Sequence, residues 1–443
     1  MHSDARPTLS FGRASRRSFL LAASVATVAA CQPDKDEAGA PGASSTAGAS
    51  PSPSAPPPPT VQITSPANGA GNVPASMEIA CTVGNATKTD VLFVDAGGEQ
   101  IAGVPHSTAG NWMPAKQLKY ATGYEARVTV TGVDGKTTTA TAAFTTMKKP
   151  GNLGKVTGVV NDGQTVGVAM PFIINFGVDV AKDNRAALQR RLSVVSDPPQ
   201  EGAWNWFNAK ELHFRPREYW QPGTKLTLKA PIGGLPIGGK WYADRDLTTS
   251  ATVGRKFLME VENKTHQMTV TQDGQVVRTC PVSNGRAANP SASGHMMVMI
   301  KNEWEWFDSS TFGVPSDGKG GYRLKVYWPQ RLTWDGEYLH SAPWSVDDQG
   351  KRNVSHGCTN LSPTNADWLW HQTLIGDPVI IRNTEEHVKW GNGWTDWDVS
   401  FEDYVKGSAV PYQPPAVTPS PSASSSASAS ASGSASPSSS GTP

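Results

Sequence analysis

The chain has 443 residues, and its 39 Lys and Arg side chains nearly balance its 38 Asp and Glu, which gives a formal net charge of only +1. This balance excludes the large positive charge that non-specific binding to nucleic acid or to an anionic membrane surface requires. The length predicts two to four domains. We therefore expect a multidomain protein that does not bind nucleic acid.

Residues 1–31 have the pattern of an export signal with a lipobox. Paired arginines, Arg16 and Arg17, precede an apolar run that is too short to remain in a bilayer, and such a pair is typical of the twin-arginine route. The run ends in "VAAC", which resembles a bacterial lipobox and predicts lipidation of Cys31. A plain signal peptide with an incidental cysteine is the alternative. We expect an exported lipoprotein of the cell membrane that faces the cell wall on the extracellular side.

Two stretches of low complexity enclose the ordered part of the chain. Residues 32–59 and 414–443 are rich in Pro, Ser and Ala and lack apolar periodicity. Segments of this composition cannot bury enough apolar surface to offset the entropy of ordering. We predict a disordered linker and a disordered tail.

Between them, short alternating runs separated by Gly, Asn and Asp turns predict strands throughout. We expect two all-β sandwich units at 60–148 and 149–254, which we interpret as spacers. A third β-rich unit follows at 255–383, with a hairpin turn in "QDGQ" and one helix in "SPTNADWLWHQTL", capped by Ser362. A Trp-rich C-terminal segment at 384–413 is expected to fold back on this unit.

One stretch concentrates reactive side chains. Residues 353–360, "NVSHGCTN", place a histidine, Gly357 and Cys358 in succession. If Cys31 is lipidated, three cysteines remain, so at least one thiol stays unpaired in an exported protein. A thiol needs a base to form the nucleophilic thiolate, and His340, at the end of the run "GEYLH", is the candidate. Gly357 suits a turn whose backbone N–H groups form an oxyanion hole.

Two other interpretations of Cys358 remain open. A zinc site needs three or four ligands in tetrahedral array, and the set of His340, His356 and Cys358 has no obvious fourth member and no CxxC or HxxxH spacing. We expect no metal and no other cofactor. A buried, inert thiol is the second alternative, and it is the role that we expect for Cys280 on its strand.

The stretch "HSAPWSVDDQGKRNVSHGCTN" resembles the active-site signature of the L,D-transpeptidases, in which a histidine and a loop precede Ser-His-Gly-Cys-x-Asn. The similarity extends through "DSSTFGVP", "GGYRLKVYW" and "SPTNADW" to the Trp-rich C-terminal segment. It implies a mainly β fold with two immunoglobulin-like domains before a catalytic domain at 255–383. One departure is "NPSASGH" from Asn289, where the family usually carries a Thr-Pro-x-Gly type loop.

The resemblance assigns roles around the cysteine. It implies that Cys358 is the nucleophile, that His340 is its base, and that Ser341 orients this base through its backbone carbonyl. His356, Gly357 and Cys358 would together shape the oxyanion hole.

The resemblance also implies a substrate and a reaction. Tyr322 would lie on a flap over the site, and Asn360 and Ser355 are expected on the substrate side. Cys358 would attack the third residue, usually diaminopimelate, of a peptidoglycan tetrapeptide stem, release D-alanine and pass the acyl group to a second stem as a 3→3 cross-link that supports cell shape. Carbapenems would acylate the same thiol. The alternatives are hydrolysis by water, as an L,D-carboxypeptidase, and an inactive wall-binding lipoprotein. The oligomeric state is not predicted.

Overall fold

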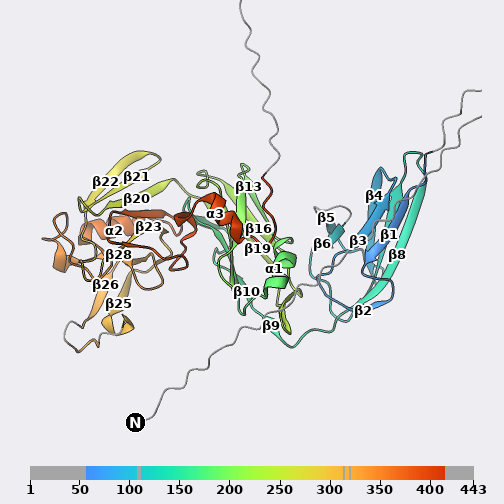
Figure 1. Ribbon diagram of the computed structural model, residues 1–443, viewed down its shortest axis with the longest axis horizontal. Coiled ribbons are helices and arrows are strands. Elements are labelled where there is room, and N and C mark those ends of the chain that lie inside the picture. The colour runs from blue at the N-terminus through green and yellow to red at the C-terminus, as the bar shows by residue number, and fades with distance from the viewer. Residues whose placement is uncertain (1–55, 107–110, 313–314, 319–320, 415–443) are drawn as a thin grey trace, which may run out of the picture. The chain divides into compact units, whose positions relative to one another are not determined.

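The residues described by the computed structural model are 56–106, 111–312, 315–318 and 321–414. The predicted signal segment, Cys31, most of the linker at 32–59 and all but the first residue of the tail at 414–443 lie outside them. The described chain consists mainly of strands with a few short helices, which confirms the predicted mainly β fold (Figure 1). Within it, no helix has the length and apolar content needed to cross a membrane.

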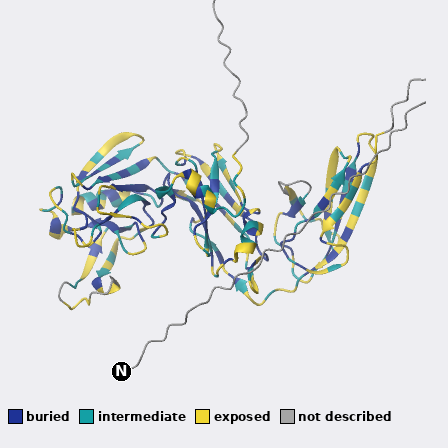
Figure 2. Ribbon diagram, in the orientation of Figure 1, coloured by how far each residue is buried: buried dark blue, intermediate teal, exposed yellow. Residues whose placement is uncertain are grey.

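The first unit is a small β-sandwich. Its strands are β1 (Thr60–Ser65), β2 (Ala70–Val73), β3 (Ala80–Gly84), β4 (Lys88–Asp95), β5 (Gly103–His106), β6 (Asn111–Pro114), β7 (Gly123–Thr131) and β8 (Thr137–Thr146). The main sheet has the order β2-β8-β7-β4, while β1 pairs with β3 and β5 with β6. Buried residues alternate along β7, where Ala126, Val128 and Val130 face the core (Figure 2). This period of two is the pattern that the sequence predicts for a half-buried strand.

The second unit contains two four-stranded sheets, with the orders β10-β12-β15-β14 and β11-β19-β16-β13, and a small sheet β17-β18-β9. Its strands are β9 (Leu153–Gly154), β10 (Val156–Gly158), β11 (Gln164–Val166), β12 (Phe172–Phe176), β13 (Ser193–Asp197), β14 (Gly202–Trp206), β15 (Glu211–Pro216), β16 (Lys225–Ala230), β17 (Pro236–Gly238), β18 (Trp241–Ala243) and β19 (Leu247–Val253). A helix that the sequence analysis did not expect, α1 (Lys182–Gln189), lies between β12 and β13. Its N-cap, Ala181, makes no side-chain capping bond, so the usual start signal of a helix is missing.

The third unit is built on a six-stranded sheet with the order β22-β21-β20-β30-β23-β31 and a four-stranded sheet with the order β24-β27-β28-β29, and the hairpin β25–β26 is separate. Its strands are β20 (Phe257–Glu262), β21 (Gln267–Gln272), β22 (Gln275–Pro281), β23 (Ala292–Met297), β24 (Ile300–Lys301), β25 (Trp304–Asp308), β26 (Arg323–Tyr327), β27 (Gln330–Arg331), β28 (Tyr338–Ser341), β29 (Thr359–Leu361), β30 (Pro378–Arg382) and β31 (Glu386–His387). Two 3₁₀ helices, η1 (Ser309–Phe312) and η2 (Pro343–Ser345), follow β25 and β28.

Two local predictions for the third unit are confirmed. Asp273 and Gly274 connect β21 to β22 with φ values of 51° and 85°, as a two-residue hairpin turn with two positive φ angles requires. Helix α2 (Pro363–Gln372) begins after Ser362, whose hydroxyl accepts a hydrogen bond from the Asn365 N–H at 3.3 Å. Its residue Leu369 is fully buried in the core of this unit.

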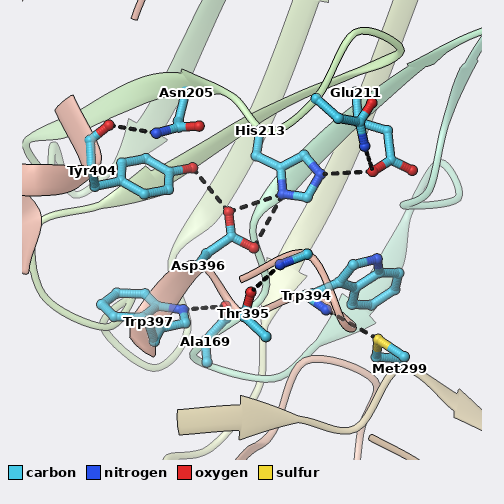
Figure 3. A network of polar contacts seen from close by, with 12 residues as sticks. Ala169, Asn205, Glu211, His213, Met299, Trp394, Thr395, Asp396, Trp397 and Tyr404 are labelled. Carbon is cyan, nitrogen blue, oxygen red and sulfur yellow. Dashed lines mark hydrogen bonds and ion pairs between the residues drawn. The ribbon is translucent and has the colours of Figure 1, made fainter. Parts of the chain in front are cut away.

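The C-terminal segment contains η3 (Asp396–Asp398), α3 (Phe401–Tyr404) and η4 (Val405–Gly407), and it contacts both the second and the third unit. Asp398 accepts a hydrogen bond from the His295 N–H of β23 at 2.9 Å. Asp396, which is fully buried, lies 2.9 Å from His213 Nδ1 of β15 and accepts a hydrogen bond from the Tyr404 hydroxyl at 3.0 Å (Figure 3). The segment therefore joins the two units as well as folding back on the third.

The apolar core of the second unit also extends into the rest of the chain. It includes Met297, Met299 and Trp394, which belong to the third unit and the C-terminal segment. Trp397 adds a hydrogen bond from its indole N–H to the Ala169 carbonyl at 2.8 Å. The interpretation of the second unit as only a spacer is therefore wrong, because its removal would expose these apolar side chains and leave Asp396 without His213. The exact domain boundaries remain a prediction.

We expect Asp396→Ala to lower the free energy of unfolding of this part of the protein by about 3–5 kcal/mol, because His213 Nδ1 and the Tyr404 hydroxyl would stay buried without a hydrogen-bond partner. Urea unfolding followed by Trp fluorescence would measure the change. Asp347→Ala, at an exposed loop position, is the control and should leave the transition nearly unchanged. If Asp396→Ala lowered the free energy of unfolding no more than Asp347→Ala does, the contact between Asp396 and His213 would not hold the units together.

Candidate active site

The parallel pairing of β28 with β29 brings the predicted base next to the segment that carries the cysteine. His340 on β28 is in register with Asn360 on β29, and Cys358 immediately precedes β29. His340 is buried, and its Nδ1 lies 3.0 Å from the Ser341 carbonyl oxygen. Because a carbonyl can only accept, Nδ1 carries the proton and Nε2 is left as the basic nitrogen. The contact that the resemblance implied for Ser341 is thus present.

A tight turn at residues 355–358 presents the cysteine, and its own polar groups hold it. The Ser355 hydroxyl donates to the Cys358 carbonyl at 2.6 Å and accepts from the Gly357 N–H at 3.1 Å. Gly357 has φ of +126°, which side-chain-bearing residues rarely adopt. The Ser291 hydroxyl donates to the Gly357 carbonyl at 2.5 Å. Since the Gly357 N–H is already bonded, its predicted part in an oxyanion hole requires this bond to be given up.

The Cys358 thiol is neutral at rest. Burial, reinforced by the charges of Glu337 and Asp335, raises the pKa of this thiol to about 12, although the Tyr338 N–H acts in the opposite direction. The sulfur lies 3.6 Å from the Gly336 carbonyl oxygen, to which the thiol donates. A neutral thiol is the form that this environment favours.

His340 is neutral for a related reason. Burial lowers the pKa of its imidazole to about 4, and the bond to Ser341 only partly opposes this shift. The ring is flanked by Phe307 and Trp344, with centroid separations of 5.1 and 6.0 Å. Within the described residues, His340 and Cys358 share no hydrogen bond. The two pKa shifts therefore favour a neutral histidine and a neutral thiol.

Tyr322 and His356 lie at the open side of the site. Their rings are 5.7 Å apart, and the pKa of Tyr322 is raised by burial and by the nearby Cys358. Tyr322 directly precedes β26, whose partner strand β25 places Phe307 against His340. The β25–β26 hairpin thus covers the histidine from the side of Phe307, as expected for a flap. The Arg286 guanidinium donates to His356 Nε2 at 2.8 Å, and burial together with this cation lowers the pKa of His356.

Asn360 and Ser355, both predicted on the substrate side, are engaged with the protein itself. The Asn360 side-chain amide donates to the Ser345 hydroxyl at 3.0 Å, and its backbone N–H donates to the Ser283 carbonyl at 2.9 Å. Both side chains are buried, at 2% exposure for Asn360 and 7% for Ser355. These contacts make the two residues supports of the site, and direct contact with substrate stays a prediction for them.

Three residues of the site were missed from the sequence. Ser291 supports Gly357, Arg286 binds His356, and Glu337 lies beside Cys358. Ser291 belongs to the loop that departs from the family pattern, and Glu337 is the one acidic residue in the run "GEYLH". Only the departure of the loop that holds Ser291 was noted from the sequence, and only tertiary structure shows what these residues touch.

The other reactive groups lie elsewhere. Cys280 is completely buried in the core of the third unit, and burial raises its pKa to about 11. His371 is exposed on α2. In the part of the chain that the structure describes, no three His, Cys, Asp or Glu side chains converge as a metal site would need.

Residues 256–381 match the family described as the L,D-transpeptidase catalytic domain, and residues 70–236 match the bacterial Ig domain. L,D-transpeptidase 2 of Mycobacterium tuberculosis is 32% identical over 346 residues, which cover 78% of this chain and 84% of that protein. L,D-transpeptidase 5 of the same organism is 32% identical over 366 residues, which cover 80% of this chain and 78% of that protein. The chain belongs to the L,D-transpeptidase family.

Among solved structures, LD transpeptidase LdtMt1 in complex with imipenem is 33% identical, covers 52% of this chain and 99% of that one, and has a TM-score of 0.45. The L,D-transpeptidase family cross-links peptidoglycan, so the predicted enzyme class and the predicted order of immunoglobulin-like and catalytic parts are confirmed. The roles assigned to individual residues of this L,D-transpeptidase stay predictions.

The neutral resting state predicts how the thiol responds to pH. Alkylation of Cys358 by iodoacetamide should accelerate about tenfold per pH unit between pH 7 and 9, because the thiolate fraction of a thiol with a raised pKa grows in that proportion. Peptide mass spectrometry would separate this reaction from that of Cys280. A rate that stays constant over this range would instead indicate a preformed thiolate–imidazolium pair.

Proposed function

We propose that this L,D-transpeptidase uses Cys358 as its nucleophile and His340 as its general base to form 3→3 cross-links in peptidoglycan. One observation carries the proposal: the β28–β29 pairing places a buried histidine with a basic Nε2 beside the strand that the cysteine turn precedes. The hydrogen bond to the Ser341 carbonyl fixes the tautomer of His340. In an arrangement of nucleophile, base and orienting group, this is the role of the orienting group.

The reaction follows from these groups. As Sγ attacks the carbonyl carbon of the third stem residue, Nε2 of His340 accepts the thiol proton. The imidazolium then donates this proton to the amine of the departing D-alanine, which leaves a thioester. The amine of a second stem attacks the thioester and loses a proton to His340, which passes this proton to the departing sulfur and so restores the thiol. The bond energy of the first peptide bond is thus conserved, and no external energy source is needed.

Burial gives the base its role. Separating charge between a thiol and an imidazole is unfavourable in this environment, as the opposite shifts of their pKa values indicate. The thiol proton is therefore transferred as the sulfur bonds to the substrate carbon, and the negative charge goes to the carbonyl oxygen and not to a free thiolate. His340 must remove the proton at that moment, because the fraction of thiolate formed without it is very small.

We expect His340→Ala to slow acylation by a tetrapeptide donor about 10²-fold, the usual scale for loss of a general base, and Cys358→Ala to abolish it. Intact-mass analysis would follow the acyl-enzyme, and mass spectrometry of the products would identify the 3→3 dimer. His371→Ala, which removes an exposed histidine of the same unit, is the control. An adduct that persists in Cys358→Ala would refute the proposal, and release of only the hydrolysed tripeptide would identify an L,D-carboxypeptidase.

We further propose that Cys31 is lipidated and anchors the enzyme to the cell membrane on its outer side. The support is the sequence "VAAC" after a short apolar run. In the expression host, Cys31→Ala should move the protein from the membrane fraction to the soluble fraction or leave its signal peptide uncleaved. Equal membrane retention and an unchanged mass of the two proteins would count against the anchor.

A further inference from the structure

A second acidic group lies beside the nucleophile. Glu337 directly precedes β28 and is partly buried, and both of its carboxylate oxygens accept from the single N–H of Ala292, at 3.0 and 3.2 Å. A Cβ placed on Gly357 would be 3.8 Å from Glu337 Cγ, so this side chain runs along the turn that presents Cys358. Glu337 is also among the charges that raise the pKa of the Cys358 thiol.

This carboxylate has no cationic partner. Among the described residues, no Lys, Arg or His forms an ion pair with Glu337, and Arg286, on the other side of the turn, is bonded to Asn289 and His356. Burial raises the pKa of Glu337 to about 8, and the charges of Asp335 and Glu386 act in the same direction. A partly buried carboxylate without a counter-charge disfavours folding, so protein stability does not account for it.

We propose that Glu337 binds the side-chain ammonium group of the third residue of the donor stem, the residue whose carbonyl Cys358 attacks. The inference rests on the proposed function. The attacked carbonyl is bonded to the Cα of that third residue, so its side chain begins only two bonds from the reacting carbon. An ammonium group there supplies the positive charge that the protein does not provide at this point.

The attacking amine of the acceptor is the other amine near the site, and the structure favours it less. That amine must be neutral to attack the thioester, whereas a carboxylate stabilises the protonated form. His340 is already the base for this step. An effect of Glu337 should therefore appear in formation of the thioester and not in its aminolysis.

The proposal predicts a dependence on pH. The titratable groups that the structure brings near Glu337 are Asp335 on the same loop, Glu386 on β31 and Cys358 after the turn, and Ala292 contributes only its N–H. Below about pH 8 the carboxyl group is mostly neutral and attracts an ammonium weakly, and above this pH it is charged. The KM of a donor with a side-chain ammonium should fall as the pH rises from 6.5 to 8.5.

The test compares two tetrapeptide donors that differ only in the third residue, whose side-chain amine is either unmodified or acetylated. At pH 8.5 the wild-type enzyme should be acylated by the ammonium donor with a kcat/KM at least about tenfold higher, the scale of one hydrogen bond to a charged group. Glu337→Gln keeps an oxygen that can accept from Ala292 but removes the charge. For Glu337→Gln, the ratio of kcat/KM for the ammonium donor to that for the acetylated donor should lie within about twofold of one. The KM of this variant for the ammonium donor should no longer vary between pH 6.5 and 8.5. Glu385→Gln, the same substitution at an exposed position that does not act on the pKa of Glu337, should keep the preference.

Acylation by a penem that carries no cationic group measures the reactivity of Cys358 independently of the proposed ammonium site. If the wild-type enzyme reacted with neither donor nor penem, the proposed function itself would fail. If Glu337→Gln reacts with the penem and keeps the full preference for the ammonium donor, the ammonium site is refuted. It is also refuted if only the aminolysis step changes. Should Glu337→Gln not react with the penem, Glu337→Asp, which keeps the charge, decides: a preserved preference supports the site, and loss of the preference overturns it.

Discussion

The site depends on one structural constraint, the parallel pairing of β28 with β29. This register places His340 beside Asn360, and Cys358 precedes Asn360 by only two residues. The middle of β29 is fixed in turn by the mutual backbone hydrogen bonds of Ser283 and Asn360. A shift of one residue would move His340 to the opposite face of its strand, away from the cysteine turn. The supports around the turn are therefore as important to catalysis as the reacting groups.

Burial around this pair determines its chemistry. The same low polarity that keeps the Cys358 thiol protonated keeps His340 unprotonated, so the resting enzyme stores no reactive thiolate. Above about pH 8, where Glu337 is charged, its carboxylate opposes thiolate formation further. A substrate ammonium would neutralise that charge. Recognition of the correct donor and activation of the thiol would then be coupled through one carboxylate.

Local features of this protein could be predicted from the sequence, whereas contacts between distant segments could not. The "QDGQ" turn, the Ser362 cap and the left-handed Gly357 depend on neighbouring residues and are present. His340 was the candidate base from the sequence itself, but the role of Ser341 came from the resemblance, and the spacing from Cys358 alone does not specify a parallel strand pair.

The missed features each join segments far apart in the chain. Ser291 reaches Gly357 across 66 residues, and His213 reaches Asp396 across 183. No local pattern records such pairings. The second pair also explains why the spacer interpretation failed: the β pattern of the second unit was correct, but a pattern of alternation does not show which outer surface another segment covers.

The central claim is that His340 and Cys358 are both neutral before substrate binds, and an NMR titration of the His340 ring tests it most directly. Histidine-labelled enzyme would be compared with Cys358→Ala, and the His340 signal would be assigned by its absence in His340→Ala. We expect the ring to titrate only below about pH 5 and to do so equally in both proteins, since burial, not the thiol, sets its pKa. A midpoint above about pH 7 that falls by more than about one unit in Cys358→Ala would show a preformed ion pair and contradict this account.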